Sequence, residues 1–309
     1  MRITKVCDIK ECSFFLGCRF LILLATLVAP VLAVCDVVIG ITEEREGRYV
    51  GEKVALKARA LFMQRNDDWV VLDFLGDSEF TRDNKMKWTV AFDGKNLGSI
   101  TTLGASDREK HDSFNPRDNY LEIQHPEKVP TVRNKYKRFA RWSHTPEKRP
   151  LVLVSKPYFR DAERWKSYNP EDSVIGEVFK DLKSIKKTAH NCGNPPEYKY
   201  SEVTYSLKDL KIYRAYRNLK GERLVAVGMK EQYFQYCEVH ESFDEQPHWF
   251  YLGKEINHLG KNMDIIDAGD YDNDGEVEFM FSYGAYNRDG YILFESHFSG
   301  KHAYVWSYH

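Results

Sequence analysis

The sequence predicts a mainly β protein made of antiparallel four-stranded meanders, in the manner of a partial or small β-propeller. Aromatic residues make up 14% of the chain, and little of it shows helical periodicity. Short apolar runs alternate with turn signals, most regularly from residue 205 to the C-terminus. A β-sandwich is the alternative fold, because the first half of the chain shows no repeat that matches the last strands.

Residues 1–33 have the composition of a secretory signal peptide. Four basic residues precede an apolar run over residues 20–33, and small side chains stand where a signal peptidase would cleave after Ala33. We therefore expect export to the periplasm or the extracellular space, with no stable membrane span after cleavage, since the apolar run is shorter than the roughly 20 residues that a span needs. An uncleaved anchor is one alternative, and a lipoprotein acylated at Cys35 is another.

The composition of the mature chain excludes one class of partner and limits the cysteine chemistry. Its formal charge is about −3, without the concentrated basic face that nucleic-acid binding requires, so we expect no nucleic-acid partner.

Three cysteines follow the cleavage site, and export would expose them to oxidising conditions. The favoured bridge joins Cys192 to Cys237, which leaves Cys35 over, and the alternative is that no bridge forms.

Residues 34–149 are predicted to form an N-terminal β-rich region that ends in a polar, irregular stretch. Three apolar-rich strands are expected over 54–62, 68–74 and 86–92, and an Asp93-Gly94 hairpin turn leads to a fourth over 98–102. Trp69 and Trp88 are expected to fill the core. From residue 104 the pattern breaks down, which marks a boundary or an excursion from the sheet.

Residues 150–309 are predicted to form a C-terminal β-rich region. The continuous apolar run 151–154 indicates a strand buried on both faces. The best helix candidate lies within residues 168–187, where apolar side chains recur at helical spacing and lysines gather at the far end. The remaining strands are expected over 211–217, 222–229, 233–239, 248–252, 263–268, 276–283, 291–296 and 302–308, with a turn at 287–290.

The stretch from residue 264 to residue 281 is the one place with a specific chemical pattern. Asp270, Asp272 and Asp274 fall on alternate residues, Gly275 follows, and Glu278 stands at the ninth position. Such closely spaced like charges favour a hard cation, which accepts six to eight oxygens at about 2.3–2.6 Å. The predicted Ca²⁺ ligands are the side chains of Asp270, Asp272, Asp274 and Glu278 and the main-chain carbonyl of Glu276.

The residues after Gly275 decide which kind of calcium loop this is. An EF-hand needs a glutamate at position twelve followed by a helix, but Phe281 occupies that position. Residues 276–283 alternate instead, with Val277, Phe279 and Phe281 on one face, which is strand periodicity. The predicted loop therefore joins two strands. The alternative is an acidic turn without metal.

This loop resembles the FG-GAP/VCBS repeat family, whose D-x-D-x-D-G-x-x-D loops lie between blade strands of integrin-type β-propellers. The resemblance is specific over about residues 263–281, and it implies a four-stranded blade over residues 262–309. The chain departs from the family at Glu278, where the family usually has aspartate, and it carries no second loop of this kind.

The sequence is compatible with two classes of function. No nucleophile elbow, H-E-x-x-H sequence, P-loop or dinucleotide fingerprint occurs, so no catalytic residues are assigned and enzyme activity is left open, with the balance towards none. The favoured function, which the resemblance implies, is an exported calcium-binding module that meets a protein or glycan at the cell surface. The alternative is an exported hydrolase or lyase in which the calcium loop is structural.

Overall fold

The protein is mainly β, as the sequence predicts. The computed structural model describes residues 37–45, 55–72, 85–103, 120–132, 139, 149–156, 160–184, 187–191, 199–203, 206–230 and 246–307. The chain divides into two units, Met1–Cys35 and Asp36–His309, and the elements below all belong to the second. The predicted signal peptide, Cys35, Cys192, Cys237 and the strand expected over 233–239 lie outside the described residues.

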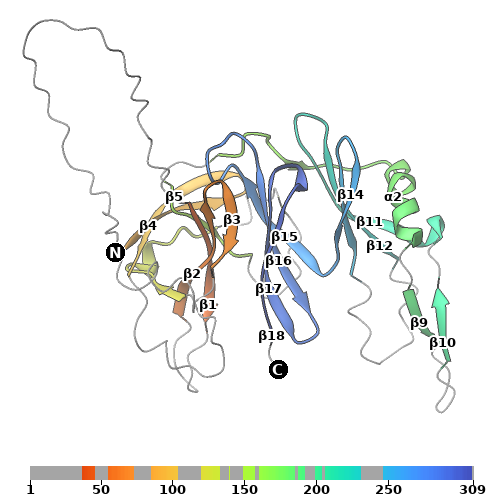
Figure 1. The fold of residues 1–309 in the computed structure, drawn as a ribbon, viewed down its shortest axis with the longest axis horizontal. Coiled ribbons are helices and arrows are strands. Elements are labelled where there is room, and N and C mark those ends of the chain that lie inside the picture. The colour runs from red at the N-terminus through yellow and green to blue at the C-terminus, as the bar shows by residue number, and fades with distance from the viewer. Residues whose placement is uncertain are drawn as a thin grey trace, which may run out of the picture. The chain divides into compact units, whose positions relative to one another are not determined.

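A seven-stranded antiparallel sheet contains the first half of the described chain. Its strands follow the order β3-β2-β1-β7-β4-β5, and β6 pairs with β2 (Figure 1). The strands are β1 (Val38–Arg45), β2 (Ala55–Arg65), β3 (Asp68–Val71), β4 (Met86–Phe92), β5 (Lys95–Thr102), β6 (Tyr120–Glu122) and β7 (Val152–Val154). Strand β7 lies beyond the boundary expected at residue 149, yet it pairs with both β1 and β4.

The seven-stranded sheet closes on itself through β6. Besides pairing with β2, this segment is joined to β5 by a bridge between Thr102 and Ile123, with flanking backbone hydrogen bonds of 2.8 and 2.9 Å. We call this closed sheet the N-terminal barrel. Its interior contains Trp88, which is fully buried, as the sequence predicts. It also contains Leu151 and Leu153, from the run that is predicted to be a strand buried on both faces.

A four-stranded meander at the C-terminus confirms the most specific part of the fold prediction. It runs β15 (Met263–Gly269), β16 (Glu278–Ala285), β17 (Arg288–Phe294) and β18 (Lys301–Ser307) in sequence order. We call it the C-terminal sheet. The turn comes earlier than the predicted 287–290, because Tyr286 and Asn287 make it and Asn287 adopts a φ of 54°.

A five-stranded sheet carries the helix. Its order is β14-β13-β12-β11-β8, with β8 (Lys166–Ser167), β11 (Leu210–Arg217), β12 (Arg223–Met229), β13 (His248–Leu252) and β14 (Ile256–Gly260). The helix α2 (Ser173–Ser184) lies within the predicted 168–187 and buries Val174, Val178 and Leu182 against this sheet, as helical spacing requires. A separate hairpin pairs β9 (Lys187–Asn191) with β10 (Lys199–Val203).

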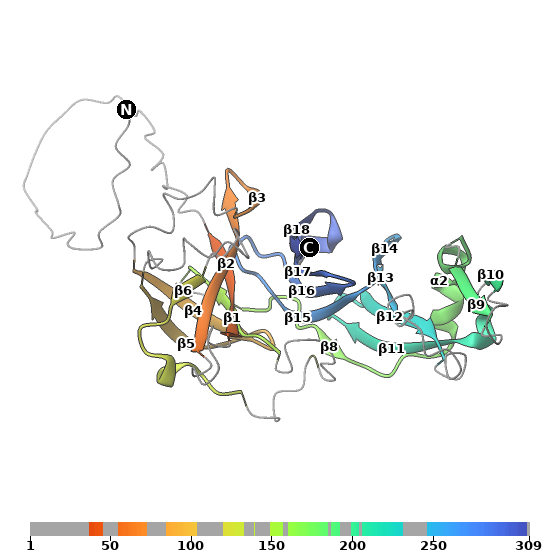
Figure 2. The same cartoon turned by 90° about the horizontal axis from the view of Figure 1, so that it is seen from below.

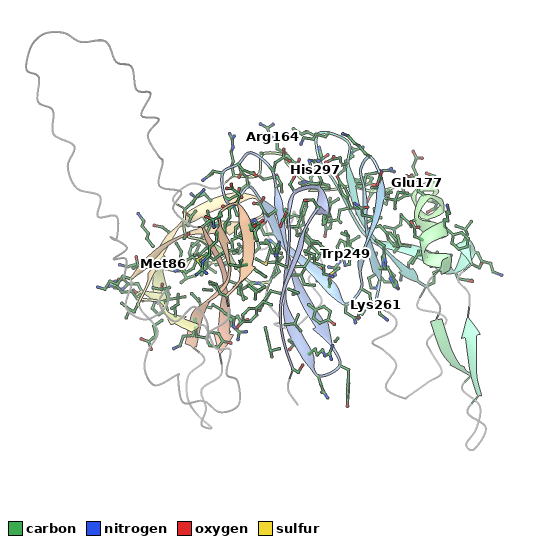
Figure 3. The ribbon with its side chains drawn as sticks, in the orientation of Figure 1. Met86, Arg164, Glu177, Trp249, Lys261 and His297 are labelled. Carbon is green, nitrogen blue, oxygen red and sulfur yellow. The ribbon has the colours of Figure 1, made fainter. Side chains whose placement is uncertain are left out.

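The C-terminal sheet lies between the other two, as Figures 1 and 2 both show. Because successive residues of a strand face opposite sides, Phe279 and Phe281 pack against the five-stranded sheet while Met280 packs against the N-terminal barrel. Trp249, which lies between two sheets in Figure 3, donates a 2.8 Å hydrogen bond from its indole to the Met263 carbonyl. The sheets thus stack face to face, and no closure into a propeller ring is seen among the described strands.

Candidate metal centre

The loop between β15 and β16 begins as part of the β structure and then turns sharply. The Asp270 amide donates to the Arg160 carbonyl at 2.9 Å, which anchors the loop's first residue to a distant segment. Asn273 and Gly275 adopt φ values of 64° and 97°, a conformation that asparagine and glycine tolerate best. The fully buried Tyr271, near the start of the loop, fixes it against the core.

Three acidic side chains of this loop converge in the interior. Asp270, Asp272 and Glu278 are 2%, 7% and 2% exposed, and each offers a carboxylate oxygen within 4.8 Å of the other two. We call them the acidic group. Glu278 comes from the first residue of β16 and reaches back to accept the Tyr271 amide at 2.7 Å. The group is therefore set by the turn of the loop and by the strand that follows it.

One oxygen of the acidic group has no partner in the described structure. Oδ2 of Asp270 accepts the Gly275 amide at 3.2 Å, but Oδ1 is buried and accepts no hydrogen bond from any described residue. A buried carboxylate oxygen without a donor is costly. A cation among the three carboxylates would satisfy it, so the donor set fits a bound metal ion.

The pKa values of the acidic group also show that its negative charges are poorly compensated. Burial, followed by the charge of Asp272, raises the pKa of Glu278 well above its usual value. Burial also raises the pKa of Asp270 and that of Asp272, and neighbouring aspartates add to both shifts. The ionised forms are thus disfavoured without a counter-charge, and a divalent ion would supply one.

Two side chains of the N-terminal barrel contact the acidic group from outside. Gln64, on β2, donates from Nε2 to Oδ2 of Asp272 at 2.5 Å, and Lys156, just after β7, donates to the Asp272 carbonyl. Partners of this kind orient metal ligands in known sites. Sequence reasoning missed both residues, because they lie more than a hundred positions away from Asp272.

The other two predicted ligands are arranged differently. Asp274 is exposed, and its Oδ1 accepts the Glu276 amide at 2.7 Å, so its carboxylate is not among the three that converge. The Glu276 side chain accepts a 2.6 Å hydrogen bond from Ser296 and pairs with His297 at 3.0 Å. The sequence predicts the main-chain carbonyl of Glu276 as a ligand, and its side chain instead contacts Ser296 and His297.

A second polar group lies where loops of the C-terminal and five-stranded sheets meet. Glu163, Glu222 and His297 offer ligand atoms within 4.8 Å of one another, and we call them the loop-end group. His302, which lies near His297 in the chain, is not part of this group and pairs with Glu295 at 2.5 Å. No sequence spacing links positions 163, 222 and 297.

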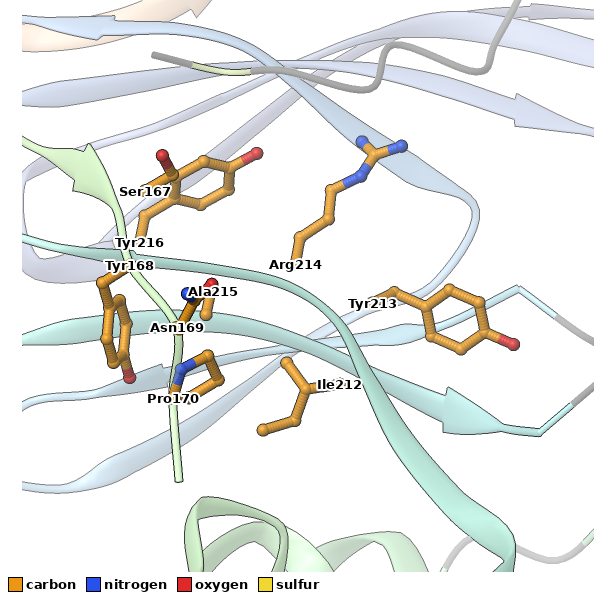
Figure 4. A pocket seen from close by; sticks show the side chains of 9 residues that line it. All are labelled: Ser167, Tyr168, Asn169, Pro170, Ile212, Tyr213, Arg214, Ala215 and Tyr216. Atoms are coloured by element: carbon orange, nitrogen blue, oxygen red, sulfur yellow. The ribbon is translucent and has the colours of Figure 1, made fainter. Parts of the chain in front are cut away.

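A hollow beside the five-stranded sheet offers few chemical groups. Residues 167–170 and 212–216 line a space of about 330 Å³, shown in Figure 4. Its one charged side chain, Arg214, forms an ion pair with the buried Asp264 of β15. The guanidinium therefore links two sheets, and the hollow offers mainly tyrosine rings and backbone to a ligand.

Comparison with known proteins gives no relative for this chain. No protein-family model, no curated protein and no solved structure matches it. Within the described residues, no helix combines the length and the apolar character that crossing a membrane requires. The geometry of the two groups is therefore the basis for assigning a function.

Proposed function

We propose that this chain is an exported β-rich interaction module whose acidic group binds Ca²⁺. The observation that carries the proposal is the convergence of Asp270, Asp272 and Glu278 in the interior, with one Asp270 oxygen lacking a hydrogen-bond donor. Three carboxylates without nitrogen or sulfur donors favour a hard cation such as Ca²⁺. The loop's resemblance to FG-GAP/VCBS repeats supports the same ion and adds the Glu276 carbonyl and Asp274 as further ligands.

The bound ion would have a structural role, because it would stabilise a loop that contacts two sheets. The loop that binds it belongs to the C-terminal sheet, while Gln64 and Lys156, which contact Asp272, belong to the N-terminal barrel. Neutralising the acidic group would therefore stabilise both the loop and its contact with the barrel. At about 100 times its dissociation constant, Ca²⁺ would contribute about 2.7 kcal/mol to the free energy of unfolding. Extracellular calcium modules bind in the range of about 10⁻⁴–10⁻³ M, which suits an exported protein.

In this proposal, the ion would rigidify the acidic loop, and the loops at the ends of the sheets would meet the partner. A rigid β scaffold that presents loops is a common platform for binding proteins or glycans. The test is differential scanning fluorimetry of the purified chain with Ca²⁺ or EGTA, followed by screening of glycan and surface-protein arrays in both conditions. A melting temperature that EGTA does not change would contradict the calcium site. Ligand capture that EGTA does not weaken would show that bound Ca²⁺ is not needed to hold the binding loops in place.

An exported hydrolase or lyase is the second candidate, and the loop-end group favours it. Glu163, Glu222 and His297 bring two carboxylates and an imidazole together at the end of the sheets, next to the Tyr251 hydroxyl. Burial and the Glu222 carboxylate raise the pKa of Tyr251, which keeps its phenol protonated. Turnover of polysaccharide, peptide or phosphoester panels by the parent but not by Glu222→Gln would establish this function over the first.

A further inference from the structure

The loop-end group is assembled from segments that lie far apart in the chain. Glu163 precedes β8, Glu222 precedes β12, and His297 lies between β17 and β18. Arg164, the neighbour of Glu163, and His297 lie at the same end of the sheets in Figure 3. The group thus spans the junction of the five-stranded and C-terminal sheets, at the edge of the core cluster that includes Trp165 and Tyr251.

The donor atoms have the spacing of a small coordination shell. Nδ1 of His297 lies 3.3 Å from Oε1 of Glu222 and 3.0 Å from the Tyr251 hydroxyl. The edge of a tetrahedron with metal–ligand bonds of 2.0–2.1 Å is about 3.3–3.4 Å. One ion could therefore contact His297 and Glu222 with little movement of either side chain.

The other imidazole nitrogen has the partner that metal-bound histidines usually have. Nε2 of His297 lies 3.0 Å from Oε2 of Glu276. A histidine that binds a metal through one nitrogen almost always donates its second N–H to a carboxylate, carbonyl or water, which fixes the ring and its tautomer. With the proton on Nε2, Nδ1 accepts the Tyr251 hydroxyl at 3.0 Å, and a metal ion bound at Nδ1 would take the place of that hydrogen bond.

Glu163 supplies a carboxylate that is already oriented. It is 6% exposed, and its Oε2 accepts the Trp165 indole at 2.7 Å and the Asn218 amide at 3.1 Å. Asn218 also donates to Oε2 of Glu222 at 2.7 Å, so one amide positions both acids. Oε1 of Glu163 accepts Lys220 at 2.7 Å, but the Lys220 side chain is 53% exposed and can move into solvent.

We propose that the loop-end group is a second metal site, for a borderline divalent cation of the Zn²⁺ class. Glu163, Glu222 and Nδ1 of His297 would be the protein ligands, and Glu276, Asn218 and Trp165 would orient them. The imidazole donor separates this site from the all-oxygen acidic group, which suits Ca²⁺. The His297 side chain is 43% exposed, so water could complete the coordination.

The test titrates the full chain with Zn²⁺ in saturating Ca²⁺, by calorimetry and by the visible spectrum of Co²⁺ as a substitute. We expect one Zn²⁺ site that His297→Asn abolishes. Asparagine is the better choice than alanine, because it tolerates the φ of 52° at this position. Glu276→Gln should weaken Zn²⁺ binding by about 10–100-fold, as the loss of an orienting partner does. Lys220→Met should tighten it, because a competing charge is removed.

Two matched variants distinguish Zn²⁺ binding at the loop-end group from binding elsewhere on the chain. His302→Ala removes another histidine paired with a carboxylate in the same region, and Zn²⁺ uptake should be unchanged. Asp270→Asn disables the acidic group, and it should lose Ca²⁺ while keeping Zn²⁺. The proposal is overturned if the parent takes up no Zn²⁺ in saturating Ca²⁺, or if His297→Asn binds it with the parent's affinity. Either result leaves the calcium site untouched.

Discussion

Gln64 Nε2 donates a 2.5 Å hydrogen bond to Oδ2 of Asp272, across 208 positions of the sequence. This contact connects strand β2 of the N-terminal barrel to the acidic loop of the C-terminal sheet. It makes the candidate calcium site part of the contact between two sheets and not an isolated surface loop. The consequences can be measured on single variants.

Gln64→Leu should destabilise the protein and weaken its response to calcium. The hydrogen bond ends on a charged, buried carboxylate, and such bonds contribute about 1.5–3 kcal/mol. Urea unfolding in saturating Ca²⁺ measures the loss. Gln124→Leu is the control, since it makes the same substitution at an exposed position of the barrel. Equal unfolding midpoints for the two variants would mean that the Gln64 contact contributes nothing.

Glu278→Gln should have opposite effects with and without calcium. Without metal, the substitution removes one of three buried like charges while its amide oxygen can still accept the Tyr271 N–H, so stability should be unchanged or higher. With Ca²⁺, the variant should gain less stability than the parent, because a ligand charge is missing. Melting temperatures in EGTA and in Ca²⁺ give both values. Glu255→Gln, at an exposed glutamate, should match the parent in each.

The stabilisation by calcium should grow as the pH rises. Because the folded metal-free protein raises the pKa values of Asp270, Asp272 and Glu278, it binds more protons than the unfolded chain above about pH 4. Its free energy of unfolding should therefore fall as the pH rises from there through the raised pKa values. Bound Ca²⁺ removes this penalty, so the difference in melting temperature between Ca²⁺ and EGTA should be small near pH 4.5 and larger at pH 7.5. A difference that is independent of pH would argue against these carboxylates as ligands.

Tyr291→Phe should loosen the same contact between sheets at a second point. The hydroxyl of the buried Tyr291 donates to Glu43, which also pairs with the buried Arg59 at 3.1 Å. Removing the donor leaves the partly buried Glu43 carboxylate with one partner fewer, at a cost of about 1–3 kcal/mol. Chemical denaturation measures this cost. Tyr286→Phe, at a tyrosine that is 68% exposed, should change stability by less than about 0.5 kcal/mol.

The parts of the fold that the sequence predicts correctly are those with local signals. Alternation after Gly275 identifies strand β16, and the structure buries Val277, Phe279 and Phe281 together on one face. The apolar run at 151–154 predicts a strand buried on both faces, and Val152 and Leu153 indeed belong to different clusters. In both cases the residues of a single strand contain the information.

The turn between β16 and β17 shows how a local signal can mislead. Gly290 is typical of a turn, but it lies in β17, where an added Cβ would collide with the Tyr304 carbonyl oxygen of β18. The glycine is there because the neighbouring backbone comes close. The short segment β6 and the closure of the barrel through Thr102 and Ile123 depend on pairing between distant segments, which the sequence of neither segment reveals.

In the candidate sites too, local sequence patterns reveal some residues and miss those contributed by distant segments. Spacing along the loop points to Asp270, Asp272 and Glu278, but it points equally to Asp274, whose carboxylate does not join the other three. It misses Gln64, Glu163 and Glu222, because only the stacking of the sheets brings them to their partners. The spacing of residues along the chain can predict which side chains share a loop, but it cannot predict which residues meet where two sheets pack together.

Calorimetric titration with Ca²⁺ of the purified chain and of Asp270→Asn determines whether the acidic group binds calcium. We expect one Ca²⁺ ion per parent chain and little or no uptake by the variant. Ca²⁺ at about 100 times its dissociation constant should raise the parent's melting temperature by about 5–10 °C, from about 2.7 kcal/mol. Absence of Ca²⁺ uptake by the parent, with both proteins melting at the same temperature in Ca²⁺ and in EGTA, would contradict calcium binding by the acidic group.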